Sequence, residues 1–201
     1  MLKPHTKLDI DWEWFNNRLD RQDGCERIPA PHLALKQQIA DGEKHYNLDN
    51  CAHYVYNSDT FRDWLPENFL SSEGYTGEVL IKVLEHPPAS FTEPHTDGYG
   101  SVKRKFGLPK ETNIKRLWIP CGDYKIGHAL FIGEWNVVHN YSAGDVFDIT
   151  PWQNTLHSGV NAGVESRRIM TITGTVDSAI PNSSRNTEAQ RTILSLSAKE
   201  F

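Results

Sequence analysis

The sequence has few features of membrane, secreted or nucleic-acid-binding proteins. It has no apolar run long enough to span a bilayer, and its first residues lead into a polar, acidic segment without the hydrophobic region of a signal peptide. Its three cysteines form no Cys-x-x-Cys pair, which argues against a disulfide framework and a thiolate zinc site. The net charge is -5, and the longest basic run is the short Lys103-Arg104-Lys105. We therefore expect a cytoplasmic protein with reduced thiols that binds neither nucleic acid nor a membrane.

What the sequence does contain is typical of one folded domain. At 201 residues, the chain is long enough to bury a sizeable core. A hydrophobic content of 38% with 10% aromatic residues fits a globular protein and not a disordered one. No internal repeat or low-complexity tract divides the chain. The sequence leaves the oligomeric state open.

The first third of the chain, residues 1–74, is predicted to be a helical elaboration of this domain. Asp9 or Asp11 is expected to cap the first helix. Pro66 predicts a break in the last one, because proline lacks the amide hydrogen that a helix interior needs. An extended piece is expected at 51–56. The segments with apolar residues at helical spacing are 9–20, 32–40 and 60–70.

After Gly74 the pattern changes to short runs rich in β-branched residues, separated by turn-forming residues. Such strands, with few helix signals between them, predict a mainly β sandwich or barrel and not a parallel βαβ sheet. This core is expected over 75–177, and a linker with a C-terminal helix is expected over 178–201. The expected strands are 77–85, 115–121, 129–132, 136–139, 145–150, 155–160 and 168–176.

The first candidate for chemistry is His95-Thr96-Asp97. Side chains alternate along an extended segment, so an imidazole nitrogen of His95 and a carboxylate oxygen of Asp97 can converge on one ion. These are two of the three ligands of a two-His-one-carboxylate site, which leaves positions open on iron(II). Alone the tripeptide means little, because composition predicts about 0.6 His-x-Asp by chance in this chain.

Three downstream histidines are candidates for the third ligand: His128, His139 and His157. We favour His157, because Arg167 and Arg168 follow it ten and eleven residues later. An arginine fork can pair with one carboxylate of a diacid whose other end reaches the metal. Neither His128 nor His139 has an arginine at a usable distance, so a structural or surface role is expected for both.

The ordered set His95-x-Asp97, Gly144-Asp145, His157 and Arg167 or Arg168 resembles the Fe(II)/2-oxoglutarate-dependent dioxygenases. Within them it is most similar to the aspartyl/asparaginyl β-hydroxylase and L-proline 3-hydroxylase branch. The resemblance covers roughly residues 75 to 177. The segments that suggest this branch are His86-Pro87, Pro94-His95-Thr96, Arg116-Leu-Trp118-Ile-Pro120, Phe131-Ile-Gly-Glu134, Phe147-Asp148 and His157-Ser-x-x-Asn161.

The resemblance implies a double-stranded β-helix of the jelly-roll or cupin type, in which two sheets enclose a metal held by His95, Asp97 and His157. It implies Fe(II) as the metal, with open positions that 2-oxoglutarate and O2 occupy. Relatives that halogenate have a small residue at the carboxylate position. The retained Asp97 therefore favours hydroxylation.

The resemblance also assigns residues to the cosubstrate. Arg167 matches the arginine for the distal carboxylate of 2-oxoglutarate by its spacing from the distal histidine, and Arg168 is the alternative by its flanking isoleucine. Arg116 matches the arginine of the branch's Arg-x-His pattern. The histidine of that pattern is replaced by Trp118, for which we expect stacking on the cosubstrate.

We therefore predict an iron(II)- and 2-oxoglutarate-dependent hydroxylase of an amino acid, whether a free small molecule or a residue in a peptide. The loop 98–113 and the helical third are expected to line the substrate pocket, and the basic run in that loop is either a solvated face or a contact for an acidic substrate. Two other interpretations stay open. One is a cupin-like metal-binding domain, an isomerase or ligand-binding protein, that does not activate O2; the other is a structural β-sandwich without metal.

Overall fold

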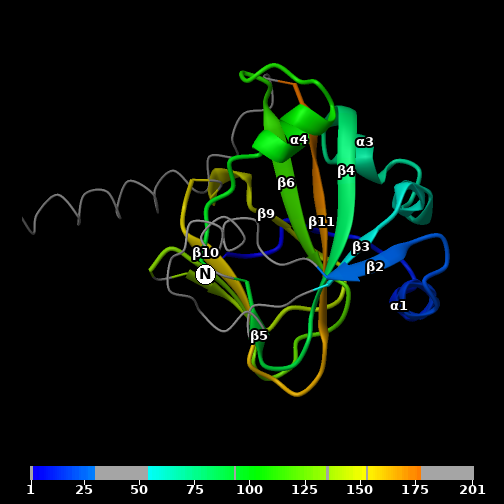
Figure 1. Cartoon of the computed structure of the whole chain (residues 1–201), viewed down its shortest axis with the longest axis vertical. Coiled ribbons are helices and arrows are strands. Elements are labelled where there is room, and N and C mark those ends of the chain that lie inside the picture. The colour runs from blue at the N-terminus through cyan, green and yellow to red at the C-terminus, as the bar shows by residue number, and fades with distance from the viewer. Residues whose placement is uncertain (1, 30–53, 93, 135, 153, 178–201) are drawn as a thin grey trace, which may run out of the picture.

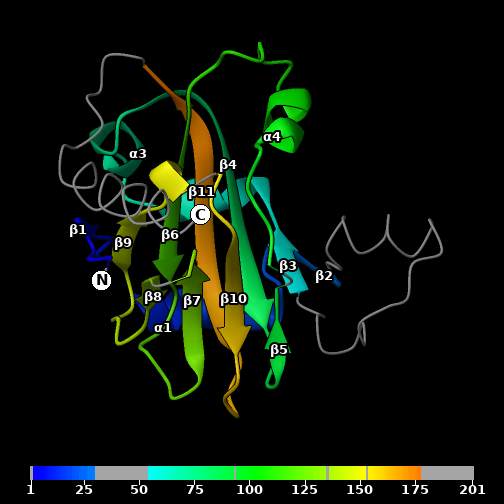
Figure 2. The same ribbon diagram turned by 90° about the vertical axis from the view of Figure 1, so that its left-hand side faces the viewer.

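The computed structural model describes residues 2–29, 54–92, 94–134, 136–152 and 154–177. In this part of the chain two antiparallel sheets face each other (Figure 1), and Figure 2 shows the small sheet in front of the large one. In spatial order, the large sheet consists of β1 (Thr6–Lys7), β9 (Asp145–Asp148), β6 (Ile114–Pro120), β11 (Arg167–Val176), β4 (Tyr75–His86), β3 (Tyr54–Asn57) and β2 (Glu26–Pro29). The small sheet consists of β5 (Ser90–Phe91), β10 (His157–Asn161), β7 (His128–Ile132) and β8 (Asn136–Val138).

The order in which the chain visits the two sheets defines the fold. From β4 to β11 it passes repeatedly from one sheet to the other, so that β4, β6, β9 and β11 lie in the large sheet and β5, β7, β8 and β10 in the small one. This is the double-stranded β-helix, or jelly roll, of mainly β proteins. The predicted fold class is confirmed. All seven predicted strands are present. Among the strands from β4 to β11, only β5, with two residues, was not predicted from the sequence pattern.

The strands β6, β9 and β11 of the large sheet divide their side chains between two apolar cores. In β6, Leu117 and Ile119 belong to the core on the outer face, whereas Trp118 belongs to the core between the sheets. This alternation follows from the two-residue period of a strand. The inner core comprises Trp118, Leu130, Ile132, Val138, Tyr141, Phe147, Ile149, Trp152 and Ile169. The large sheet therefore presents one face to the barrel interior and one to the helices of the N-terminal part.

The outer core is covered by α1 (Trp12–Arg21), η2 (Asp59–Trp64) and α3 (Phe69–Ser72). Asp11 caps α1 by accepting a hydrogen bond from the amide of Trp14, as one of the two predicted caps. The predicted helix at 60–70 is interrupted at Leu65 and Pro66, as proline requires. Two short helices, α4 (Gly100–Lys105) and η3 (Thr150–Trp152), lie after β5 and β9.

Outside the predicted strands of the barrel, the structure adds elements to the prediction, and some predicted segments lie outside the described residues. β3 lies in the predicted extended piece at 51–56, but β1 and β2 were not predicted and add strands to the largely helical first third. The helix α4 replaces part of the expected loop 98–113. The predicted helix at 32–40 and the linker and helix over 178–201 lie outside the described residues. No helix in the described ranges is long and apolar enough to cross a membrane.

A buried carboxylate ties α1 to the outer face of the large sheet. Glu85 of β4 is 3% exposed and accepts hydrogen bonds from Tyr56, Arg27 and Arg168 at 2.7, 2.6 and 2.9 Å. Arg168 also pairs with Asp20 of α1. Burial alone would raise the pKa of Glu85, but the hydrogen bonds from Tyr56 and Arg27, together with the charge of Arg168, outweigh it and lower the pKa.

Replacing this carboxylate should destabilise the protein strongly. We expect Glu85→Gln to lower the free energy of unfolding by about 3 kcal/mol near neutral pH, because it leaves Arg168 without its buried partner. Since the folded pKa of Glu85 is depressed, the difference from wild type should shrink as the pH falls through that pKa. Urea unfolding at several pH values measures both effects. The control Asp23→Asn, which removes an exposed partner of Arg21, should cost less than about 1 kcal/mol, and equal losses for the two variants would contradict the assignment.

Candidate metal centre

The backbone brings His95 and His157 together. The amide of His95 donates to the carbonyl of His157 at 3.0 Å, and the amide of His157 donates to the carbonyl of His95 at 2.9 Å, which makes an isolated antiparallel bridge beyond the end of β5. Residues directly opposite in such a pair project their side chains to the same face. The two imidazole rings accordingly lie with their centroids 4.4 Å apart. His157 thus joins the His-x-Asp segment through two hydrogen bonds.

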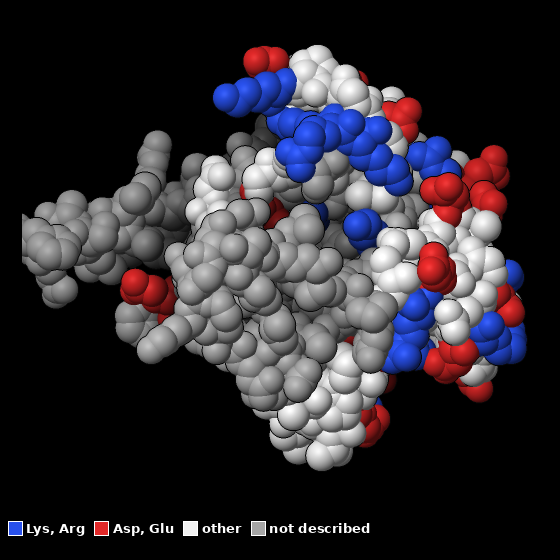
Figure 3. Space-filling model, viewed as in Figure 1, with Lys and Arg blue, Asp and Glu red and all other residues white. Residues whose placement is uncertain are grey.

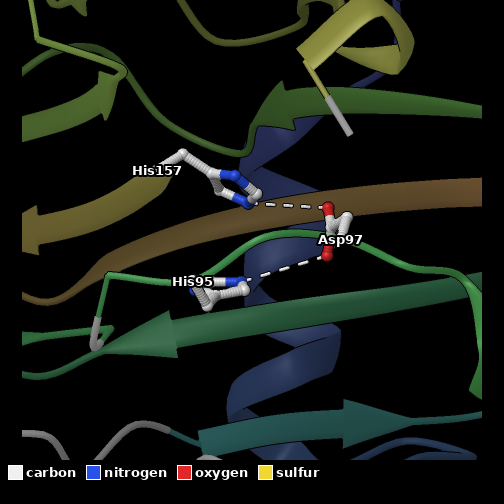
Figure 4. Close-up of side chains that lie close together, drawn as sticks. All are labelled: His95, Asp97 and His157. Atoms are coloured by element: carbon white, nitrogen blue, oxygen red, sulfur yellow. Dashed lines mark ion pairs between the residues drawn. The ribbon is translucent and has the colours of Figure 1, made fainter. Parts of the chain in front are cut away.

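Asp97 completes the cluster from two residues further along the segment (Figure 4). Its Oδ1 lies 3.9 Å from Nε2 of His95, and its Oδ2 lies 3.5 Å from Nε2 of His157. One ligand atom from each residue falls within 4.8 Å of the others. The side chains of His95, Asp97 and His157 are 22%, 12% and 10% exposed, so the cluster lies just inside the barrel.

The orientation of His157 suits a metal ligand. Its Nδ1 lies 2.9 Å from the carbonyl oxygen of Thr155. Because a carbonyl can only accept, this hydrogen bond places the proton on Nδ1 and leaves the lone pair of Nε2 facing Asp97.

The spacing of the three ligand atoms fits a single ion. Donor atoms bound to one metal at about 2.1 Å lie about 3 to 3.4 Å apart for octahedral or tetrahedral angles. The distances of 3.5 and 3.9 Å end on different oxygens of Asp97, and a set with one atom from each residue falls within 4.8 Å, so the three donors need to approach one another by at most about 2 Å. Two imidazoles and one carboxylate form the donor set of non-haem iron(II) sites with open positions.

Arg116 of β6 keeps the carboxylate of Asp97 charged. Its guanidinium pairs with Oδ2 of Asp97 through Nη1, and its Nε donates to the hydroxyl of Thr173 at 2.9 Å. Burial would raise the pKa of Asp97, but the neighbouring His157 and the charge of Arg116 outweigh it and lower the pKa to about 2. Asp97 is thus ionised at neutral pH, as a carboxylate that binds a metal must be. The predicted cosubstrate residue Arg116 contacts the carboxylate ligand directly.

Arg167, at the start of β11, lies inside the barrel. It is 2% exposed and stacks its guanidinium over the ring of Trp118 at 5.3 Å from the centroid. Its Nη1 donates to the carbonyl of Val160, but its buried Nε and Nη2 have no hydrogen-bond partner among the described residues. The hydroxyl of Tyr141, also buried, lies close by but short of hydrogen-bond geometry.

Arg168, the alternative residue for the cosubstrate, lies away from the His-Asp-His cluster. Adjacent residues of a strand point to opposite faces, and Arg168 points to the outer face of the large sheet. There its guanidinium pairs with Glu85 and Asp20 and reaches Asn16 and Tyr56. It is therefore held by acidic groups outside the barrel.

The two other candidate histidines lie away from the cluster. His128 stands opposite Asn161 in the register of β7 and β10, four residues or about 13 Å along β10 from His157, and its Nε2 donates to the carbonyl of Glu165. His139 is exposed and contacts the ring of Tyr124. Gly144 has a structural place, since its positive φ of 83° and the close carbonyl of Leu8 leave no room for a side chain.

A small cavity adjoins the cluster inside the barrel. Its lining consists of two ligands and four apolar side chains: Asp97, His157, Leu130, Ile132, Ile149 and Trp152. A larger groove of about 550 Å³ lies outside the barrel, against η2, α3 and the start of β4, away from all three ligands. We place the chemistry at the smaller cavity, because the ligand cluster opens into it.

Sequence reasoning did not identify two residues beside Arg167, namely Tyr141 and Gly159. Tyr141 lies outside the strands and had no signal. Gly159 follows His157 by two residues, so the alternation of a strand places it on the same face. A Cβ on Gly159 would lie 2.8 Å from Cε1 of His86 and 3.4 Å from Nη1 of Arg167, so a larger residue at this position would displace the ring of His86.

Fold and cluster together define a double-stranded β-helix protein with a His-Asp-His cluster that can hold a metal ion. No family model matches the chain, and no curated protein matches its sequence. Among solved structures, a cupin 2 conserved barrel domain protein from Rhodopseudomonas palustris is 9% identical with a TM-score of 0.42, and the match covers 84% of this chain and 86% of that one. A sugar phosphate isomerase from a cupin superfamily from Silicibacter pomeroyi is 10% identical with a TM-score of 0.41, covering 76% and 73%. At such values the likeness assigns neither family nor activity, and the fold rests on the strand order itself.

Removing the carboxylate of Asp97 should weaken metal binding strongly. We expect Asp97→Ala to weaken iron(II) binding by more than about 100-fold, beyond the effect typical of residues that only support a ligand. His139→Ala should bind iron(II) like wild type, because that side chain is exposed and distant from the cluster. Equilibrium dialysis under anaerobic conditions measures both affinities. Equal affinities in the two variants would show that the metal does not bind at Asp97.

Proposed function

We propose that the protein is a non-haem iron(II)- and 2-oxoglutarate-dependent oxygenase that hydroxylates a C–H bond of an amino acid, free or within a peptide. The observation that carries this proposal is the buried guanidinium of Arg167 beside the His-Asp-His cluster. A cytoplasmic location and the absence of nucleic-acid and membrane partners belong to the same proposal.

The position of Arg167 suits the distal carboxylate of a chelating diacid. Its Nη1 lies against Gly159, which is two residues from His157 on the inward face of β10. Two residues along a strand correspond to about 6.6 Å. A five-carbon 2-oxo diacid could therefore reach from the metal ligands to this guanidinium with its second carboxylate.

The charge of Arg167 supports the same conclusion. Among the described residues no carboxylate pairs with it, and burial lowers its pKa. A buried cation without a counter-ion is costly, and a bound carboxylate would offset that cost while filling the bidentate fork. The hydroxyl of Tyr141 is near enough to add a donor. The ring of Trp118 lies under the guanidinium of Arg167, so we propose that it supports this cation and does not stack on the cosubstrate.

Iron(II), when bound, supplies O2 activation coupled to decarboxylation of the 2-oxo acid. The residues of the chain determine what surrounds that chemistry. Asp97 occupies the position that a halide would need, which favours hydroxylation. The cavity walls formed by Leu130, Ile132, Ile149 and Trp152 are apolar and disfavour water, which would protect a reactive oxidant from side reactions.

The proposed activity is tested by succinate formation. Protein loaded with iron(II) should convert 2-oxoglutarate and O2 to succinate and CO2, slowly alone and faster with its substrate. The Asp97→Ala protein serves as the matched control and should form none. Metal binding without any succinate from wild type would contradict the oxygenase proposal and favour a cupin-like domain that binds metal without activating O2.

Arg167 should determine the affinity for 2-oxoglutarate. We expect Arg167→Met to weaken its binding by at least about 30-fold, as for the loss of one partner of a buried charge pair. Arg168→Met should bind it like wild type, although it is less stable, since that guanidinium faces the outer core. Anaerobic titration of the iron(II) proteins, followed by the metal-to-ligand charge-transfer absorption, gives the affinities. The reverse order of effects would overturn the assignment.

A further inference from the structure

Lys82 is a half-buried lysine on the inward face of β4. It stands opposite Thr171 of β11, and it lies four residues from His86, which stands opposite Arg167. Residues four apart in a strand share a face and are about 13 Å apart. Lys82 and Arg167 therefore occupy the same wall of the barrel at well-separated levels.

The His-Asp-His cluster extends from near the level of Arg167 toward the end of the barrel that carries Lys82 and Arg116. Gly159 of β10 lies against Arg167. His157 lies two residues from Gly159 along β10, on the side away from Asn161, which donates a hydrogen bond to the carbonyl of His86. Asp97 pairs with Arg116, whose strand position is opposite Thr173, beyond the level of Lys82. The cluster thus has one cationic side chain on the Arg167 side and a second group of cations on the other side.

The charge of Lys82 is not balanced by the residues around it. No ion pair among the described residues includes Lys82. Burial lowers its pKa, and the positive charges of Lys105 and Arg116 lower it further. Arg116 differs, because Asp97 already neutralises it. A partly desolvated ammonium beside two other cations attracts an anion.

The helix α4 adds positive charge at this end of the barrel. Its last turn carries Lys103, Arg104 and Lys105, and Figure 3 shows Lys and Arg side chains gathered over this helix. The ammonium of Lys103 is directed to the carbonyl of Lys110, whereas Lys105 acts on Lys82 through its charge. The basic run therefore adds to the positive potential around the half-buried Lys82.

We propose that Lys82, with Lys105 beside it, binds a carboxylate of the substrate on the side of the metal cluster opposite Arg167. This inference rests on the proposed function and adds the substrate class: an amino acid or peptide whose oxidised residue lies near an acidic group. The cosubstrate carboxylate then takes the Arg167 side and the substrate carboxylate the Lys82 side. The cavity at the cluster would receive the C–H bond between them.

Matched carboxylate and amide probes test this assignment. Binding of L-aspartate, L-asparagine, L-glutamate, L-glutamine and the corresponding glycine-capped tripeptides is measured by calorimetry on anaerobic protein loaded with iron(II) and 2-oxoglutarate. We expect at least one carboxylate to bind about 10-fold or more tightly than its amide, because the charge pair is partly desolvated. Lys82→Met should remove this preference, Lys82→Arg should retain it, and the exposed-lysine control Lys7→Met should leave it unchanged.

The outcomes separate this inference from the proposed function. If wild type forms no succinate but Lys82→Met loses the carboxylate preference on metal-loaded protein, the subsite stands and the oxygenase proposal fails. A panel in which no carboxylate binds more tightly than its amide would overturn the subsite. So would a Lys82→Met protein that keeps the preference, or one that instead loses affinity for 2-oxoglutarate, which would place the cosubstrate at Lys82.

Discussion

The candidate centre depends on one backbone interaction, the pair of hydrogen bonds between His95 and His157. These residues are 62 positions apart in the chain. The antiparallel bridge places both imidazoles on one face, and the alternation of an extended segment then adds Asp97. Without the bridge, the His-x-Asp segment would be a loop with two polar side chains. With it, three donors converge at the edge of the barrel interior.

Positive charges lie at two separate levels of the barrel interior. Their positions on either side of the cluster are the basis for the proposed binding of two anionic ligand groups. Apolar side chains fill most of the space between the sheets, while Arg167 lies at one level and Lys82 with Arg116 at another. Buried cations are costly unless an anion accompanies them. Asp97 accompanies Arg116, whereas the other two have no carboxylate partner among the described residues. Two anionic groups from ligands would complete the balance on either side of the metal.

The sequence predicted the strands of the barrel because their side chains alternate between two buried faces, which leaves a strong pattern of β-branched residues. It did not predict β5, because two residues carry no pattern, nor β1 and β2, which lie in a segment with helical signals. The helix α4 was missed for the related reason that six residues between glycines look like a loop.

For the site, the sequence separation between residues was informative, but the sequence did not show which side chains point into the barrel. The distance from His157 to an arginine narrowed the choice to Arg167 or Arg168, but only the register of β11 decides which of two neighbours points inward. For the same reason the sequence did not identify Lys82. Its proposed role depends on its level in the barrel and on the lack of a carboxylate partner among the described residues. Such properties arise from strand pairing across long sequence separations.

The most direct test of the pairing between Arg167 and a distal carboxylate is the choice between two 2-oxo acids. Anaerobic iron(II) protein is titrated with 2-oxoglutarate and with pyruvate, which chelates a metal in the same way but lacks the second carboxylate, and the charge-transfer absorption is followed. If Arg167 receives that carboxylate, 2-oxoglutarate will saturate the absorption at a concentration at least about 30-fold lower than pyruvate. Equal affinities, or no absorption with either acid, would contradict this use of the barrel.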